Sequence, residues 1–142
     1  MKIGIAQIKP LKGDIERNLD KHLKFINNAL EKQPDLLMFP ELSLTGYEPE
    51  LARSLAIHSD DSRLTPLQEI SDQYNIILCV GAPTINNDDL FISMIIFHPN
   101  RERVTYSKQY LYPSEEGIFT AGHTPCIIPY DEENRIAPAI CY

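Results

Sequence analysis

Apolar residues in the first third of the chain follow two different spacings. Residues 2–9, KIGIAQIK, alternate with Ile3 and Ile5 on one side, which predicts a strand with both faces partly buried. Further along, apolar positions recur every three or four residues, as on one face of a helix of about four turns. These positions are Ile15, Leu19, Leu23, Ile26 and Leu30. Asp14 is expected to cap this helix and Pro34 to end it.

The same reasoning predicts a second strand, a second helix and a third strand. Residues 35–40, DLLMFP, form a short apolar run closed by proline, which is typical of a strand covered on both faces. A helix is expected to begin at Thr65, with Thr65 as its cap, Pro66 in the first helical position and Gln68 completing a capping box. The apolar run NIILCVGAP at 75–83 predicts the next strand.

The second half of the chain predicts strands and loops. Residues 90–108 are expected to form a hairpin with its turn at 98–101, followed by a long loop rich in Pro, Gly and Glu over 109–124. Residues 126–142 predict a short strand, an acidic turn and a final buried strand. The order strand, helix, strand, helix, strand and hairpin favours a layered α/β fold with helices on one face of the sheet.

Composition and charge narrow the classes of function. The 142 residues are 43% hydrophobic, which is sufficient for the core of one domain over residues 1–142. A net charge of −7 argues against a general nucleic-acid partner. The absence of a long apolar run and of a signal peptide predicts no membrane partner and a cytoplasmic location. Since G-x-G-x-x-G, Walker-type and G-x-S-x-G sequences are also absent, a nucleotide-binding domain and a serine hydrolase are disfavoured.

Cysteine and histidine positions do not predict a metal site or a disulfide framework. Cys79, Cys126 and Cys141 are odd in number and irregularly spaced, so reduced thiols are expected. His123 and Cys126 in HTPC lack a second pair of ligands, and no zinc is predicted there. His22 is expected on the polar side of the first helix, without a catalytic role.

Three polar residues close predicted strands and are candidates for chemistry. Glu41 follows the 35–40 strand, Lys108 closes the hairpin and Cys141 closes the final apolar run. Taken singly, they are interpreted as a solvated loop acid, a charge that protects a sheet edge and a small inert hydrophobe. Because sites in layered α/β folds collect at strand ends, the three would form a nucleophilic site if they met in one crevice.

The segments around these residues, taken in order, resemble the nitrilase superfamily of carbon–nitrogen hydrolases. They are FPELSLTGY at 39–47, YSKQYLYPSEEGIFTAG at 106–122 and AICY at 139–142, and the opening KIGIAQIKPLKGDIERNLDKHL at 2–23 is similar as well. The resemblance covers essentially the whole chain. It implies a nitrilase-like α-β-β-α layered sandwich, of which this chain would hold roughly the first half.

The resemblance also implies roles for individual residues. Glu41 matches the general base, Lys108 the catalytic lysine and Cys141 the nucleophile. Glu115 matches the second glutamate of many members, although the alignment leaves its neighbour Glu116 open. These types suit the task, because a thiol needs a base and a nearby cation to act as a nucleophile at neutral pH.

Two tyrosines complete the expected site. Tyr47 and Tyr142 are expected to border the pocket, although an aromatic side chain beside a core is usually packing. The backbone N–H of Tyr142 would also stabilise the oxyanion, as the resemblance implies.

The implied reaction is hydrolysis of a small linear amide through a cysteine thioester, with release of ammonia and no cofactor. Nitriles, N-carbamoyl amines and glutamine stay open as substrates, and a non-catalytic protein that acts in binding or assembly is the alternative class. Chains of this family continue past the cysteine, so we expect an N-terminal portion that is inactive or nearly so by itself. A homo-oligomer is expected, since a half-sandwich exposes apolar surface and strand edges.

Overall fold

The computed structural model describes residues 1–58 and 60–141, and its main feature is a five-stranded sheet in the order β1-β2-β3-β4-β5. Its strands are β1 (Ile3–Ile5), β2 (Leu36–Met38), β3 (Ile77–Asn86), β4 (Asp89–Phe97) and β5 (Val104–Ser107). β1, β2 and β3 run parallel to one another, whereas β4 and β5 are antiparallel to their neighbours. The strands and the hairpin predicted within residues 2–108 are confirmed, although β1 is shorter than the apolar run that predicted it.

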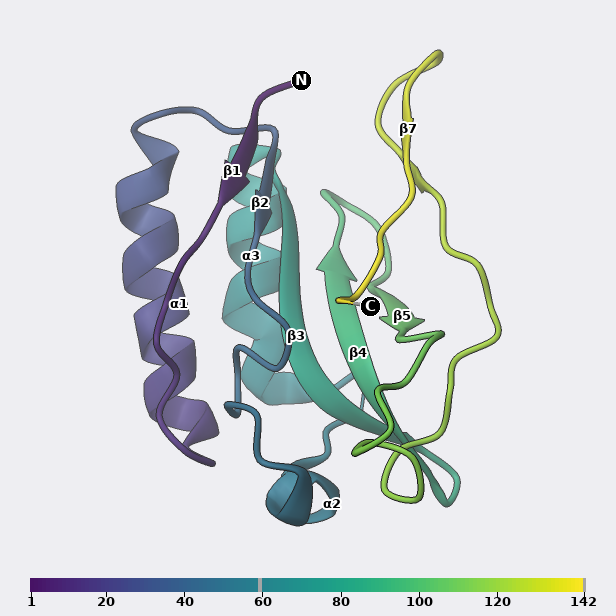
Figure 1. The fold of residues 1–142 in the computed structure, drawn as a ribbon. Helices are drawn as coiled ribbons and strands as arrows, with labels where there is room; N and C mark the ends of the chain where they lie inside the picture. Colours follow the sequence, from purple (N-terminus) through teal and green to yellow (C-terminus); the bar gives the residue numbers. More distant parts are fainter. Residues whose placement is uncertain (59, 142) are drawn as a thin grey trace.

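Helices cover one face of this sheet (Figure 1). The two longer ones are α1 (Ile15–Leu30) and α3 (Thr65–Tyr74), and shorter segments lie between β2 and α3. These are η1 (Pro49–Leu51), α2 (Ala52–Leu55) and η2 (Ser62–Leu64). Within the part of the chain that the structure describes, no helix has the length and apolar character needed to cross a membrane.

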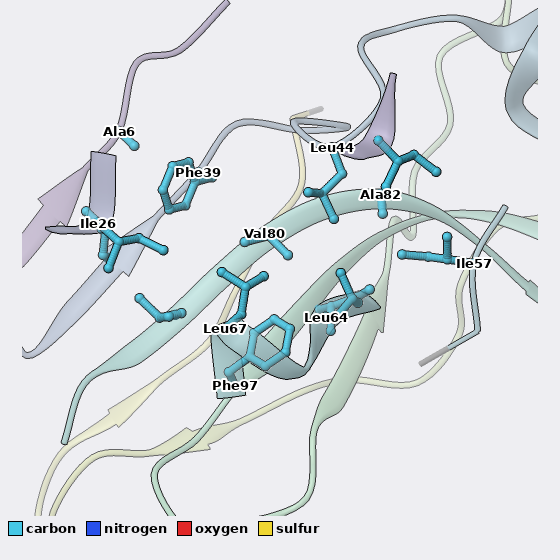
Figure 2. Packing of buried hydrophobic residues seen from close by; sticks show 14 of the residues in the cluster. Ala6, Ile26, Phe39, Leu44, Ile57, Leu64, Leu67, Val80, Ala82 and Phe97 are labelled. Atoms are coloured by element: carbon cyan, nitrogen blue, oxygen red, sulfur yellow. The ribbon is translucent and has the colours of Figure 1, made fainter. Parts of the chain in front are cut away.

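The predicted apolar stripe of α1 packs on the sheet, as its spacing requires. Ile15 and Ile26 belong to the buried core between the helices and the sheet, and Leu19, Leu23 and Leu30 pack against it. Figure 2 shows Ile26 together with Val80 of β3 in this cluster. The helical layer therefore follows directly from the three-and-four spacing of the sequence.

The opposite face of the sheet is covered by the segment that follows β5. This segment includes a small hairpin of β6 (Ile128–Pro129) and β7 (Arg135–Ile136), and Figure 1 shows it across the sheet from the helices. Its buried side chains join a second apolar cluster with residues of β3 and β4. The prediction of a final buried strand is wrong, since β7 ends at Ile136, residues 137–141 have no regular structure and Cys141 is exposed.

The predicted helix caps had different outcomes. The Asp14 cap is confirmed, because its carboxylate accepts the backbone N–H of Arg17 at 3.0 Å. The Thr65 cap is wrong, since Thr65 is the first helical residue of α3 and makes no capping hydrogen bond. The preceding η2 already pairs the backbone N–H of Thr65 with the carbonyl of Ser62, so the chain enters α3 without a side-chain cap.

This difference predicts unequal effects of two alanine substitutions. Asp14→Ala is expected to lower the free energy of unfolding by about 1 kcal/mol, because the capping bond is lost. Thr65→Ala, the matched control, is expected to change it by less than about 0.5 kcal/mol, since no capping bond exists there. Urea unfolding measures both values, and an equal loss in the two variants would contradict the assignment.

Candidate active site

Glu41 lies on the loop that follows β2, where this loop touches β3. A Cβ atom added to Gly81 would lie 2.4 Å from the carbonyl oxygen of Pro40 and from the amide nitrogen of Leu42. Glycine is therefore required where the two backbones meet. Directly after Glu41, Leu42 takes the left-handed conformation with φ 51°, which turns the chain back over β3. Sequence and packing together thus hold Glu41 at the end of β2.

Lys108 follows β5 and is held by its backbone on both sides. Its N–H donates to the carbonyl of Ile92 on β4 at 2.8 Å, and its own carbonyl accepts from Gly122 at 2.8 Å. A Cβ atom on Gly122 would lie 2.5 Å from the carbonyl oxygen of Ser107, so this contact also depends on glycine. The Lys108 side chain is 1% exposed, and a buried ammonium needs partners to compensate for lost hydration.

Two carboxylates supply those partners. The Lys108 ammonium donates to Glu41 Oε1 at 2.9 Å and to Glu115 Oε1 at 2.8 Å. Glu115 Oε1 also accepts from the Tyr47 hydroxyl at 3.2 Å, and Glu115 Oε2 accepts from the backbone N–H of Tyr112 at 2.8 Å. The result is one cation between two anions, with the orientation of Glu115 defined at both of its oxygens.

Lys108 and Glu115 keep their charges at neutral pH. Burial by itself would lower the pKa of Lys108, but the hydrogen bonds and charges of Glu115 and Glu41 outweigh it and raise that pKa above its ordinary value. Burial would likewise raise the pKa of Glu115, but the Lys108 ammonium and the Tyr112 N–H hold it below its usual range. Lys108 is therefore a fixed cation rather than a proton acceptor.

A cavity of about 320 Å³ lies beside the cluster, and both Glu41 and Cys141 line it. Most of its other walls are apolar and come from the ends of β1 and β2, from β4 and from the chain before Cys141. They include Ile5, Met38, Phe39, Met94 and Ile140. Cys141 has a left-handed backbone with φ 50° and an exposed side chain. Cys141 and Glu41 thus line the same space, and the Glu41 carboxylate accepts a hydrogen bond from the Lys108 ammonium.

The structure therefore brings most of the sequence-predicted site residues together. Glu41, Lys108, Glu115 and Tyr47 form one hydrogen-bonded cluster, and Cys141 shares a cavity with Glu41. Of the two glutamates that the resemblance left open, Glu115 contacts Lys108, whereas the neighbouring Glu116 is exposed. The remaining predicted residue, Tyr142, lies outside the described residues.

His22 does not lie on the polar side of α1, as the sequence analysis expected. It is fully buried, with Nδ1 2.7 Å from the carbonyl oxygen of Asn18 and Nε2 2.9 Å from Ser43 Oγ. Burial lowers the pKa of His22 to about 4, so the imidazole is neutral. The sequence contained a signal, because His22 comes seven residues after Ile15 and four before Ile26, on the same helical face.

A solved structure has the same architecture as the described part of this chain. An amidase from Nesterenkonia sp. matches the chain with a TM-score of 0.83 and 24% sequence identity, over 100% of this chain and 56% of that one. The sheet with helices on one face is thus the first half of the layered sandwich that the sequence predicted.

The chain itself belongs to the carbon-nitrogen hydrolase family, whose profile matches residues 2–142. Glutamine-dependent NAD(+) synthetase of Aquifex aeolicus is 28% identical over 148 residues, covering 99% of this chain and 25% of that protein. Protein N-terminal amidase of Schizosaccharomyces pombe is 28% identical over 165 residues, covering 99% of this chain and 54% of that protein. The chain therefore spans about half or less of the length of these curated relatives.

Proposed function

We propose that the site hydrolyses the C–N bond of a small linear amide, with Cys141 as nucleophile, Glu41 as general base and Lys108 as a fixed cation. One observation carries this proposal: Glu41 lines the cavity that Cys141 also lines, and its carboxylate accepts a hydrogen bond from the buried Lys108 ammonium at 2.9 Å. Base, thiol and cation are the groups that acyl transfer through cysteine requires. Amide substrates are supported by the similarity to the fission yeast amidase.

In the proposed first half-reaction, Glu41 takes the thiol proton and the Cys141 sulfur attacks the amide carbonyl. The positive charge of Lys108 favours the negative charge that develops on the carbonyl oxygen. The C–N bond then breaks, and ammonia leaves with the proton that Glu41 returns to the nitrogen. A thioester between the acyl group and Cys141 remains.

In the second half-reaction, Glu41 takes a proton from water, which attacks the thioester. The C–S bond breaks, the carboxylic acid is released and the Cys141 thiol regains its proton. Glu115 acts through Lys108, since it holds the ammonium at 2.8 Å, and Tyr47 orients Glu115 from its other side. All proton transfers in this cycle pass through groups of the chain itself, with water as the second substrate.

Glutamine is the second candidate substrate. The similarity to a glutamine-dependent NAD(+) synthetase favours it, because the match covers 99% of this chain. The apolar walls around Met38, Phe39 and Met94 favour a short aliphatic acyl group instead, since they offer no charged partner to an amino acid. Nitriles and N-carbamoyl amines stay open, as does a role in binding alone.

A cytoplasmic location and a homo-oligomer belong to the same proposal. Support for self-association comes from β1, the edge strand of the sheet, where Ile3 is 50% exposed and Ile5 77% exposed. Apolar residues along an open strand edge favour pairing with a second copy of the chain.

The proposed function is tested by measuring a single acyl transfer to Cys141. This measurement needs only one reaction per chain and no repeated turnover. Little or no turnover is expected of this chain by itself, but one acyl transfer is. Incubation with propionamide is expected to add the acyl mass to Cys141 and to release one ammonia per thioester, as measured by peptide mass spectrometry and an ammonia assay. Cys141→Ala and Glu41→Gln are expected to abolish both signals, because nucleophile or base is lost.

Two variants serve as matched controls for this experiment. Cys126→Ala removes another thiol, and Glu116→Gln removes an exposed carboxylate next to Glu115, so both are expected to retain acyl transfer. The proposal fails if Cys141 stays unmodified in the unaltered chain, or if acyl transfer survives in Cys141→Ala.

A further inference from the structure

We propose that His22 is a positioning residue for Glu41: through Ser43, its buried imidazole holds the loop that carries Glu41 against β3. The inference rests on the proposed function only in giving Glu41 a catalytic role. His22 lies on α1 and Glu41 on the loop after β2, and the connection between them consists of hydrogen bonds that run through Ser43 and Gly81.

The hydrogen bonds of this network run in one direction. The carbonyl oxygen of Asn18 can only accept, so His22 Nδ1, 2.7 Å away, carries the proton. His22 Nε2 then has a free lone pair, and the Ser43 hydroxyl, 2.9 Å away, donates to it. The Ser43 oxygen in turn accepts the backbone N–H of Gly81 at 3.1 Å. Each group is satisfied only with a neutral imidazole that bears its proton on Nδ1.

Ser43 is two residues from Glu41, on the same tight loop. Its N–H donates to the carbonyl of Pro40 at 3.1 Å, so the loop closes around Glu41. On its other side the loop touches Gly81, where the backbones are too close for a Cβ atom. A shift of Ser43 would therefore move Glu41 relative to Lys108, whose ammonium lies 2.9 Å from Glu41 Oε1.

Asn18 secures the same loop at a second point. Its side-chain amide donates to the carbonyls of Leu44 at 3.0 Å and of Leu11 at 2.8 Å, and its Oδ1 accepts the backbone N–H of Leu11. Asn18, His22 and Ser43 are all fully buried. α1 is thus bonded to the loop through two adjacent side chains on one helical face.

The surroundings of His22 argue that the polar network has a purpose beyond packing. The imidazole lies against the ring of Phe39, with centroids 4.2 Å apart, beside the apolar cluster under α1 that includes Phe39 and Leu44 (Figure 2). An apolar side chain would fill this space without needing partners, whereas a buried imidazole is stable only when both nitrogens are bonded. Both bonds of His22 lead, through Asn18 and Ser43, to the loop that carries Glu41.

The test uses NMR signals of the ion pair in the intact 142-residue chain. The ¹⁵N resonance of the Lys108 ammonium and the ¹³C resonance of the Glu41 carboxyl report their contact directly. His22→Leu and Ser43→Ala are both expected to shift the two resonances, because each removes a link of the network. His22→Gln keeps a hydrogen-bonding group near the position of Nε2, and is expected to leave both resonances close to those of the unaltered chain.

Ser71→Ala is the matched control for lost stability. Ser71 is a fully buried hydroxyl on α3 that donates to the carbonyl of Ile76, away from Glu41, so its removal is expected to leave both resonances unchanged. The proposal is overturned if the resonances stay in place in Ser43→Ala, or if Ser71→Ala shifts them equally. Should His22→Leu not fold, Ser43→Ala and His22→Gln decide the question.

The readout separates this inference from the proposed function. The ion-pair resonances do not involve Cys141, so a shift in Ser43→Ala supports positioning even if propionamide fails to acylate the thiol. Conversely, acyl transfer to Cys141 together with unmoved resonances in Ser43→Ala would support the function and overturn the role of His22.

Discussion

Lys108→Met is expected to lower the free energy of unfolding by about 3–5 kcal/mol, one of the two largest effects that we predict. The substitution removes the cation from a side chain that is 1% exposed and leaves Glu115, 2% exposed, as a buried carboxylate without its counter-ion. Breaking one side of a buried ion pair costs far more than the pair contributes net, because the remaining charge stays unhydrated. Urea unfolding at neutral pH measures the loss.

Two controls make this prediction specific. Lys12→Met breaks an ion pair of similar length, 2.9 Å to Glu48, but the Lys12 side chain is 69% exposed, so the expected loss is far smaller than for Lys108→Met. Lys108→Met combined with Glu115→Leu removes both charges and is expected to be more stable than Lys108→Met alone. Equal losses for Lys108→Met and Lys12→Met would contradict burial as the cause.

The loss of unfolding free energy in Lys108→Met is expected to be smaller at acidic pH. Because the folded pKa of Glu115 is lowered, its stabilising contribution is complete above the ordinary glutamate pKa and is lost as pH falls through the folded value. At pH 3 the difference between the unaltered chain and Lys108→Met should therefore be smaller than at pH 7. A difference that is independent of pH would show that lost packing, rather than lost charge, destabilises the variant.

Gly81→Ala is expected to have the second large effect and to lower the free energy of unfolding by about 3 kcal/mol. The new methyl group would lie 2.4 Å from two backbone atoms, Pro40 O and Leu42 N, so the loop that carries Glu41 must move away from β3. The Glu41–Lys108 contact is expected to lengthen as a result, which the Lys108 ammonium resonance measures together with urea unfolding.

Gly4→Ala is the matched control for this substitution. Its nearest neighbour would be Leu37 Cδ1 at 2.8 Å, the end of a flexible side chain that can change its rotamer, so the expected loss is smaller. The Lys108 resonance should stay in place in this variant. If Gly4→Ala and Gly81→Ala shift it equally, the close approach at Gly81 does not position Glu41.

Local spacing was sufficient to predict most of the secondary structure. The stripe from Ile15 to Leu30 specified α1, and the Asp14 cap specified where it begins. Both depend on residues within a few positions of one another, so neighbouring residues contain the information. The wrong predictions concern features that depend on the surrounding structure. At Thr65, for example, the preceding η2 supplies the backbone hydrogen bond, so no side-chain cap forms.

His22 and Cys141 show a second kind of limit. The position of a histidine in the sequence does not reveal whether a hydrogen-bond partner for its imidazole lies in the core. The side-chain partner of His22 is Ser43, which is 21 residues away. The final apolar run before Cys141 looked like a strand, but the chain beyond Ile136 pairs with no strand among the described residues. The spacing of apolar residues predicts that their side chains are buried. Whether the segment forms a strand depends on whether another strand lies beside it and pairs with it.

The amino-acid sequence by itself determined the order of helices and strands, the apolar face of α1, and the resemblance that singled out Glu41, Lys108 and Cys141. Only the tertiary structure decided that Glu115, and not Glu116, contacts the lysine, and that Glu41 reaches it across 67 residues of sequence. The physical reason is that helix and strand spacing arise from neighbouring residues, whereas contacts between strand ends depend on the order in which β2, β4 and β5 associate.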